Sequence, residues 1–220
     1  MMKYLACILT IGLAACSQPT ERTVESRVPE LPYYNEATFT PIWTIPEDGF
    51  HHISGFELYN QLGDTITAQD LNGKICVADF FFATCPGICP QMMENMGMVQ
   101  EEFLNDDEIL LLSHSVTPEQ DSVGALRRYA KQKGVVNGKW HLLTGNQSVI
   151  YDLGRKDYFV EEDLGLQKDD DEFLHTENFV LIDKKRRIRG IYNGLRKGAV
   201  KQLIADIKTL KLEETSLTSE

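Results

Sequence analysis

A nearly unbroken apolar run from Lys74 to Phe82 constrains the fold of this chain more than any other feature. A strand that is apolar on both faces must be covered on both faces, which favours a central strand in a sheet. A loop rich in cysteine and proline follows directly, and a helical pattern begins near Pro90, a residue that suits a first helical turn. The pattern therefore predicts a buried strand, a short loop and a helix in succession, with two cysteines between strand and helix.

The rest of the chain predicts an α/β domain. Further strands are expected at 39–43, 53–59, 65–67, 109–116, 140–143, 178–183 and 188–192, and helices at 90–103, 122–133, 147–153 and 199–212. A parallel βαβ half followed by an antiparallel ββα half is typical of the thioredoxin-like fold. We therefore predict a thioredoxin-like fold with extra N-terminal strands and a central mixed sheet flanked by helices.

The first 15 residues have the features of an export signal. Lys3 is their only charge, and the apolar stretch is shorter than the roughly 20 residues that a membrane span requires. The stretch ends in Leu-Ala-Ala-Cys, which resembles a bacterial lipobox and implies cleavage before Cys16 and lipidation of that cysteine. An ordinary secretory signal that is cut nearby is the alternative. We expect a lipid-anchored protein on a cell-envelope membrane, with its domain outside the cytoplasm on the periplasmic side.

Four segments follow from this interpretation. They are a lipoprotein signal peptide at 1–15, a flexible tether at 16–36, one folded domain at 37–212 and a disordered polar tail at 213–220. The length of 220 residues fits one domain with such appendages. The net charge of −11 argues against nucleic acid as a partner, because phosphate binding requires a basic face.

Cys85 and Cys89 are the two cysteines with an expected chemical role. Cys7 lies in the signal peptide, Cys16 is the lipidation site, and Cys76 lies inside the apolar strand, where a thiol usually acts as a small hydrophobe. At a helix N-terminus, free backbone N–H groups and the helix dipole favour thiolate. Thiolate is the nucleophile of disulfide exchange and a soft ligand for copper(I). A structural disulfide would close a ring too small to stabilise the chain much, and a zinc site lacks a second ligand pair.

The histidines supply candidates for a third metal ligand. Two thiolates leave copper under-coordinated, and imidazole is a natural complement. His175 precedes the penultimate strand, and in a thioredoxin-like plan the loop that leads into this strand faces the cysteine loop. His175 is therefore the preferred candidate, although an exposed loop histidine is the alternative interpretation. The other histidines are His51, His52, His114 and His141.

Several stretches resemble the Sco/SenC family, whose members help to assemble cytochrome c oxidase. Residues 80–90 read Phe-Phe-Phe-Ala-Thr-Cys-Pro-Gly-Ile-Cys-Pro, which is similar to the family's hallmark. The segment 115–122 is similar to its Ser-Val-Asp-Pro-Glu-x-Asp-Thr segment, and 174–183 is similar to its His-Ser/Thr and Leu-Ile-Asp stretch. One departure is that Thr117 stands where the family usually has Asp, whereas Asp121 is retained. This segment is associated with metal handling and partner docking.

The resemblance implies a copper site formed by Cys85, Cys89 and His175. It also implies delivery of copper to the CuA centre of cytochrome c oxidase subunit II, or reduction of the cysteine pair of that subunit. The partners expected from it are subunit II, a copper donor protein and the membrane. On this interpretation the protein is a copper chaperone and not an enzyme in the usual sense.

Two other functions remain open. In a thiol–disulfide oxidoreductase, Cys85 and Cys89 would form a redox-active pair and copper would be incidental. A peroxiredoxin-like peroxidase is less favoured, because the Thr-x-x-Cys of that family is absent and Thr84 directly precedes Cys85. Acidic runs at 161–163 and 169–172 come before His175. They are expected to be solvated, or alternatively to attract cations or a basic partner.

Overall fold

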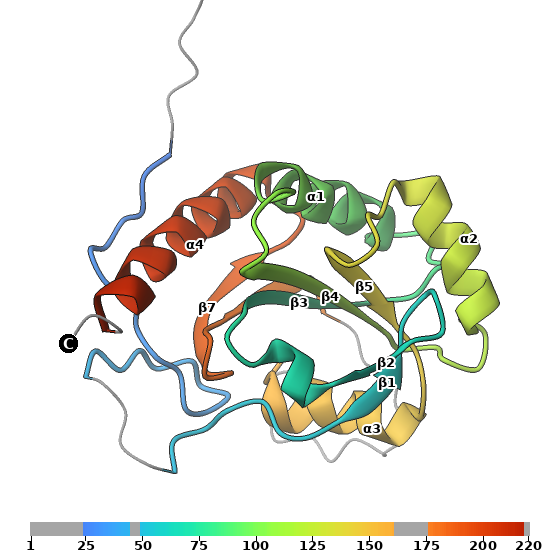
Figure 1. Cartoon of the computed structure of the whole chain (residues 1–220), viewed down its shortest axis with the longest axis horizontal. Coiled ribbons are helices and arrows are strands. Elements are labelled where there is room, and N and C mark those ends of the chain that lie inside the picture. Colours follow the sequence, from blue (N-terminus) through green and yellow to red (C-terminus); the bar gives the residue numbers. More distant parts are fainter. Residues whose placement is uncertain (1–23, 45–48, 161–175, 218–220) are drawn as a thin grey trace, which may run out of the picture.

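The structure is a computed structural model that describes residues 24–44, 49–160 and 176–217. Its elements follow one another along the chain as drawn in Figure 1. They are β1 (Glu57–Tyr59), β2 (Thr65–Thr67), the 3-10 helix η1 (Ala68–Leu71), β3 (Ile75–Phe81), α1 (Cys89–Glu102), β4 (Ile109–Ser115), α2 (Val123–Lys133), β5 (Trp140–Leu143), α3 (Gln147–Asp152), the π-helix η2 (Leu153–Asp157), β6 (Asn178–Ile182), β7 (Ile188–Asn193) and α4 (Lys197–Leu217).

A five-stranded mixed sheet in the order β5-β4-β3-β6-β7 forms the centre of the domain. Its middle strand is β3, which pairs in parallel with β4 and antiparallel with β6. All seven residues of β3 are buried, as the apolar run predicts. The predicted thioredoxin-like arrangement, a mixed sheet flanked by helices, is therefore confirmed.

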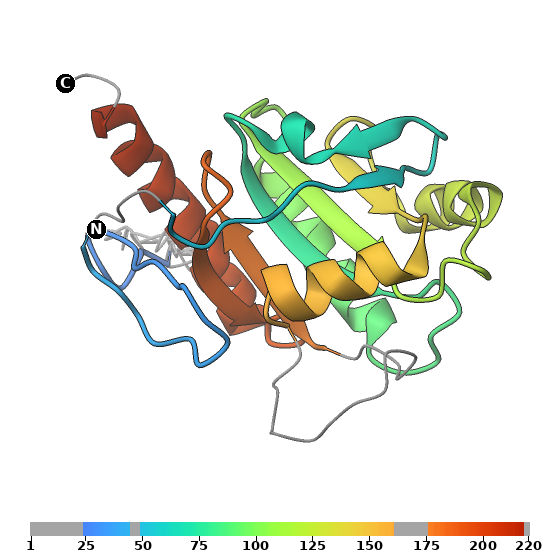
Figure 2. The ribbon, with the colours of Figure 1, turned by 90° about the horizontal axis from the view of Figure 1, so that it is seen from below.

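Alternate residues of β3 face two separate hydrophobic clusters. Val77 and Phe81 pack with α1, α2 and α4 on one face of the sheet. Ala78 and Phe80 pack with β1, β2, η1 and α3 on the other face. Figure 1 shows α1 and α4 above the sheet, and Figure 2 shows α3 lying across the opposite face. The two-residue period of a strand thus serves two cores at once.

The predicted N-terminal strands are shorter in the structure than expected. Of the strand predicted at 53–59, only β1 is regular, and the segment 39–43 contributes a single bridge between Ile42 and Tyr33. Phe39 has a φ of 51°, which a strand does not allow, and its N–H donates to the carbonyl of Glu36 at 3.1 Å. A turn therefore replaces the first half of that strand.

The tether ends earlier than predicted. Its first residues, 16–23, lie outside the described part of the chain. Leu31 and Tyr33 are buried, and Tyr34 forms a bridge to Ile188 at the edge of β7. This N-terminal segment thereby covers an edge strand that would otherwise offer its backbone for pairing. The boundary at residue 36 is therefore wrong for residues 31–36, which belong to the folded domain.

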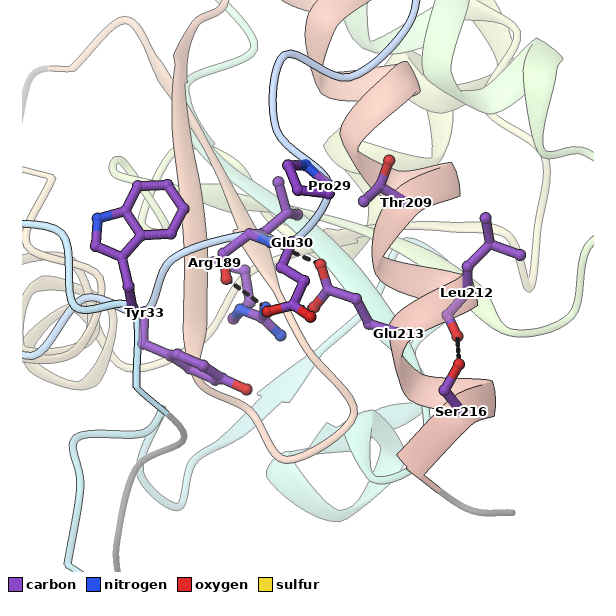
Figure 3. Close-up of a pocket in the computed structure, with 10 residues that line it drawn as sticks. Pro29, Glu30, Tyr33, Arg189, Thr209, Leu212, Glu213 and Ser216 are labelled. Carbon is purple, nitrogen blue, oxygen red and sulfur yellow. Dashed lines mark hydrogen bonds and ion pairs between the residues drawn. The ribbon is translucent and has the colours of Figure 1, made fainter. Parts of the chain in front are cut away.

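The final helix is longer than predicted. The sequence pattern ends it at 212, but α4 continues to Leu217. Glu213 explains the extension, because its carboxylate accepts from the N–H of Leu31 at 2.6 Å and pairs with Arg189 at 2.5 Å. Figure 3 shows Glu213 on α4 beside Arg189. The predicted disordered tail at 213–220 is thus wrong for its first five residues, and residues 218–220 lie outside the described part.

Candidate metal centre

The predicted cysteines lie in the loop between β3 and α1 and at the first turn of that helix. β3 ends at Phe81, and α1 begins at Cys89 with Pro90 in its first turn. Ile88 caps the helix without a side-chain hydrogen bond. Pro90 has no N–H, and the N–H groups of Gln91 and Met92 donate to the carbonyl of Ile88. The backbone N–H of Cys89, the first residue of α1, donates to the sulfur of Cys85.

Cys85 is half-buried and carries a free thiol. Burial alone would raise the pKa of this thiol, but hydrogen bonds from the backbone and thiol of Cys89 outweigh that effect. The backbone N–H groups of Gly87 and Ile88 add to them, with the Gly87 nitrogen 3.4 Å from the Cys85 sulfur. Together they hold the pKa of Cys85 below its ordinary value, as expected for a thiol at a helix N-terminus.

Cys89 differs from its neighbour because it is buried, with 5% of its surface exposed. Burial raises the pKa of the Cys89 thiol, and a hydrogen bond from the backbone of Phe82 lowers it only in part. The thiol of Cys85 and the carboxylate of Asp79 raise this pKa further. Cys85 is therefore the thiol that ionises first, and Cys89 remains protonated until a partner displaces its proton.

Asp121 fixes the start of the cysteine loop. One oxygen of its buried carboxylate, Oδ2, accepts from the N–H of Ala83 at 3.0 Å, from the hydroxyl of Ser115 at 2.7 Å and from the hydroxyl of Thr117 at 3.1 Å. The loop residue Ala83 is thereby tied to the end of β4, two residues before Cys85. Thr117, which stands where the resembling family usually has Asp, acts here as a donor to Asp121.

Tyr129 on α2 lies in the same hydrophobic cluster as both cysteines. Its ring stacks on Phe81, with the ring centroids 5.7 Å apart. Burial raises the pKa of Tyr129, and Cys89, Asp79 and other nearby acidic groups raise it further once they are ionised. Sequence reasoning missed Tyr129 because its spacing from Leu126 is that of an ordinary helical core position.

Asp79 is a fully buried carboxyl in the middle of β3. One of its oxygens accepts from the hydroxyl of Ser113, which in turn accepts from the indole N–H of Trp140 at 2.8 Å. The other oxygen has no hydrogen-bond partner. Burial raises the pKa of Asp79 to about 7, and the hydroxyl of Ser113 opposes that rise. Sequence reasoning did not single out Asp79 as a buried titratable group, although a lone Asp in an apolar strand is itself unusual.

Four of the five histidines lie elsewhere in the fold, and His175 lies outside the described residues. His51 and His52 bond to backbone carbonyls of Asp157 and Phe50. His114 stacks on Phe80 in the opposite core cluster, and His141 contacts Asn60. Across residues 24–44, 49–160 and 176–217, no group of three or more His, Cys, Asp and Glu could hold a metal ion.

Cys76 faces away from this centre. It lies in the second hydrophobic cluster, between the sheet and α3, and is fully buried. Burial raises the pKa of its thiol far above the ordinary value. Its predicted role as a small buried hydrophobe is confirmed.

In the part of the chain that the structure describes, no helix is both long and apolar enough to cross a membrane.

Comparison with known sequences identifies relatives of this chain. The family model SCO1/SenC matches residues 46–211. The SCO1 protein homolog of Bacillus subtilis is 28% identical over 163 residues, which cover 72% of this chain and 82% of the relative.

Solved structures resemble this one over about three quarters of the chain. A SCO1/SenC family lipoprotein from Bacillus anthracis has a TM-score of 0.64 at 27% identity, covering 73% of this chain and 95% of that one. BsSco, described with a disulfide switch as a member of the Sco family of cytochrome c oxidase assembly proteins, has a TM-score of 0.62 at 27% identity, covering 76% and 98%. Bradyrhizobium japonicum ScoI with copper bound has a TM-score of 0.57 at 25% identity, covering 71% and 98%. With a family model that matches most of its length, this chain belongs to the SCO1/SenC family.

Proposed function

We propose that this protein is a membrane-anchored copper-binding chaperone that assists assembly of the CuA centre of cytochrome c oxidase. The observation that carries the proposal is the pair of free thiols, Cys85 and Cys89, held at the start of α1. Copper-bound ScoI and the oxidase-assembly role of the Sco family support it. The partners in this proposal are oxidase subunit II, a copper donor protein and a membrane of the cell envelope.

The two thiols fit copper as cargo. Soft thiolate ligands select copper(I) over harder cations. Cys85 has a lowered pKa and is partly exposed, so it is the sulfur that first meets an incoming ion. Cys89 must lose a proton that burial retains, and an ion that binds Cys85 supplies the positive charge which favours that loss. The pair thus combines an accessible thiolate with a buried thiol.

His175 is the third ligand in this proposal. The chain is described again from Thr176, just before β6, and β6 runs antiparallel to β3 with Ala78 opposite Val180. The N-terminal end of β6 therefore lies beside the C-terminal end of β3, where the cysteine loop starts. His175 is three positions before Asn178, a reach of about 10 Å at most. This placement supports an imidazole beside the two sulfurs.

The anchor in this proposal is a lipid on Cys16. The resemblance of residues 13–16 to a lipobox supports it, as does the B. anthracis lipoprotein among the structural relatives. A domain anchored on the periplasmic side of the membrane would be confined to the same surface as a membrane-bound oxidase subunit. This confinement raises the effective concentration of the domain near that subunit.

Titration of the reduced protein with copper(I) against a competing chelator tests the metal site. We expect one ion per chain, and an affinity that falls at least about tenfold in Cys85→Ser, Cys89→Ser and His175→Ala. His52→Ala is the matched control, because His52 is exposed and its ring bonds to the nearby backbone carbonyl of Phe50. Equal affinities for wild type and His175→Ala would contradict the proposed ligand set.

A thiol–disulfide oxidoreductase is the second candidate, favoured by the lowered pKa of Cys85 next to a second free thiol. In this reaction the Cys85 thiolate attacks a partner disulfide, and Cys89 then resolves the mixed disulfide. The Cys85–Cys89 pair is oxidised by two electrons and the partner gains two thiols. Reduction of a CuA-domain disulfide by His175→Ala at the wild-type rate, together with unchanged copper affinity, would favour this function over the first.

A further inference from the structure

Two hollows that share lining residues open between the N-terminal segment, β7 and α4. Figure 3 draws the residues that line the smaller hollow, and Figure 1 shows α4 and the N-terminal segment on the opposite side of the domain from α2. Their volumes are about 360 and 540 Å³, and both are lined by Leu31, Trp43 and Arg189. We call the surface around them the N-terminal face; its exposed side chains include Arg27, Glu30, Trp43, Arg196 and Leu212.

Apolar side chains are unusually exposed on the N-terminal face. Leu212 is 71% exposed and Trp43 is 59% exposed, the two highest values for large apolar residues in the described part of the chain. Both line the smaller hollow. A single exposed apolar side chain is common on soluble proteins, whereas two that share a rim mark a contact surface.

Some arginines of this face have ion-pair partners and others do not. Arg189 is buried, and pairs with Glu213 and with the carbonyls of Leu31 and Pro32. Arg27 and Arg196 line the larger hollow, are exposed, and have no ion pair among the described residues. Guanidinium groups bind phosphate, and tryptophan favours the boundary between water and lipid. Glu30 lines the smaller hollow and Asp206 the larger one, and these two carboxylates offset the charges of Arg27 and Arg196. Apolar contact is therefore the larger contribution.

The short stretch of chain between Cys16 and Val24 indicates that the N-terminal face lies against the membrane. Val24 is the first described residue, eight residues after Cys16. Eight residues reach about 16 Å on average and about 28 Å when fully extended. A lipid on Cys16 therefore keeps Arg27 and its neighbours close to the bilayer, whereas the turn after α2 lies at the other end of the domain (Figure 1).

We propose that the N-terminal face docks on the phospholipid bilayer, with Trp43 and Leu212 in the headgroup region and Arg27 and Arg196 on lipid phosphates. The inference rests on the proposed lipidation of Cys16 and adds an orientation to it. Docking through this edge of the sheet fixes the orientation of the cysteine loop, at the end of β3, relative to the membrane. A domain that rotated freely on its tether would have no fixed orientation.

Tryptophan quenching by brominated lipids tests the orientation. The full lipidated chain is reconstituted in vesicles of phosphatidylethanolamine and phosphatidylglycerol, with or without bromine on the acyl chains. The chain has two tryptophans, and Trp140 is fully buried, so the difference between wild type and Trp43→Phe reports Trp43 alone. Two reporters are added in the Trp43→Phe background, Leu212→Trp on the N-terminal face and Val136→Trp as a matched exposed site just after α2.

We expect about a twofold loss of emission at positions 43 and 212 and none at 136. Equal quenching at all three positions, or no quenching at 43 and 212, would overturn the proposal, as would a dimer in solution that shields Trp43. The copper titration on the same samples reports the metal site separately. If mass spectrometry finds no lipid on Cys16, the same scan is run on protein held to nickel-chelating vesicles by an N-terminal His tag, with the same outcomes decisive.

Discussion

Asp121 shows how one buried carboxylate orders a reactive loop. Its Oδ2 atom accepts three hydrogen bonds, including one from the backbone of Ala83, so the cysteine loop and the end of β4 share one acceptor. The retained Asp of the family segment was visible in the sequence. Its partners were not, because Ala83 and Asp121 are far apart along the chain and meet only when β3 and β4 pair.

Removing this acceptor should destabilise the protein. In Asp121→Ala, the donors at Ala83, Ser115 and Thr117 lose their shared partner, and we expect the free energy of unfolding to fall by about 1–3 kcal/mol. Urea unfolding measures the change. Glu119→Gln removes a charge from an exposed position of the same loop and should shift the free energy by less than about 0.5 kcal/mol. Equal unfolding curves for the two variants would refute this role.

Two buried titratable groups should give opposite pH dependences. Burial lowers the pKa of His114 to about 4, so the unfolded chain binds the additional proton between the ordinary pKa of about 6.5 and pH 4, and stability falls on acidification. Burial raises the pKa of Asp79 to about 7, so the folded chain binds the proton first, and stability falls as the pH rises from about 4 to 7.

Single substitutions should separate these contributions. Relative to wild type, His114→Gln should become more stable as the pH falls from 7 to 4.5, and Asp79→Asn should become more stable as the pH rises from 5 to 8. Each relative change should be about 3 kcal/mol, from about 1.4 kcal/mol per unit of pKa shift. Urea unfolding at pH 4.5, 6 and 8 provides the values, and curves that run parallel to wild type would show that neither group titrates as described.

At the scale of elements, the sequence pattern was most informative where burial is two-sided or periodic. The continuous run of β3 and the periodicity of α2 predicted those elements within one or two residues. The pattern failed at 39–43, because alternation cannot reveal the positive φ of Phe39. It also missed the π-helix η2, whose residues have no distinct composition.

Gly194 holds β6, β7 and α1 together at the cysteine end of the sheet. Its N–H donates to the carbonyl of Glu177 at 2.7 Å, and its carbonyl accepts from the buried amide of Asn95 on α1 at 2.6 Å. A Cβ added there would lie 2.7 Å from the ring of Phe179 and 3.0 Å from the Glu177 oxygen. The close approach explains why the position requires glycine.

Gly194→Ala should therefore lower the free energy of unfolding by about 1–3 kcal/mol, because the buried ring and the backbone carbonyl have little room to move. Gly198→Ala is the matched control in the first turn of α4, where an added Cβ meets nothing within 4 Å. It should be neutral or stabilising by up to about 1 kcal/mol. Denaturation midpoints that move in the same direction for both variants would argue against this steric explanation.

At the scale of the whole molecule, Arg189 joins the two ends of the chain. Its guanidinium bonds to Leu31, Pro32 and Glu213, and lies 4.0 Å from the centre of the Tyr33 ring. Sequence reasoning assigned both ends to disordered segments because each is polar and lacks an apolar period. Leu31 is 158 positions from Arg189 and 182 positions from Glu213, and no local pattern reports such pairs.

Arg189→Leu should cost about 3–5 kcal/mol of unfolding free energy, because it leaves Glu213 without its buried cation, whereas Asp183 keeps its ion pair with Arg187 at 2.7 Å. Lys208→Gln removes a cation from an exposed pair with Glu102 and should cost at most about 1 kcal/mol. Equilibrium unfolding in urea compares the two. A small effect of Arg189→Leu would mean that the N-terminal segment contributes little to the fold.

The most direct measurement of the central claim is copper K-edge X-ray absorption of the copper(I)-loaded protein. Two sulfur neighbours and one imidazole nitrogen are predicted for wild type, and the imidazole scattering should vanish in His175→Ala while it persists in His52→Ala. A copper ion surrounded by sulfur alone in wild type, or identical spectra for wild type and His175→Ala, would contradict a site formed by Cys85, Cys89 and His175.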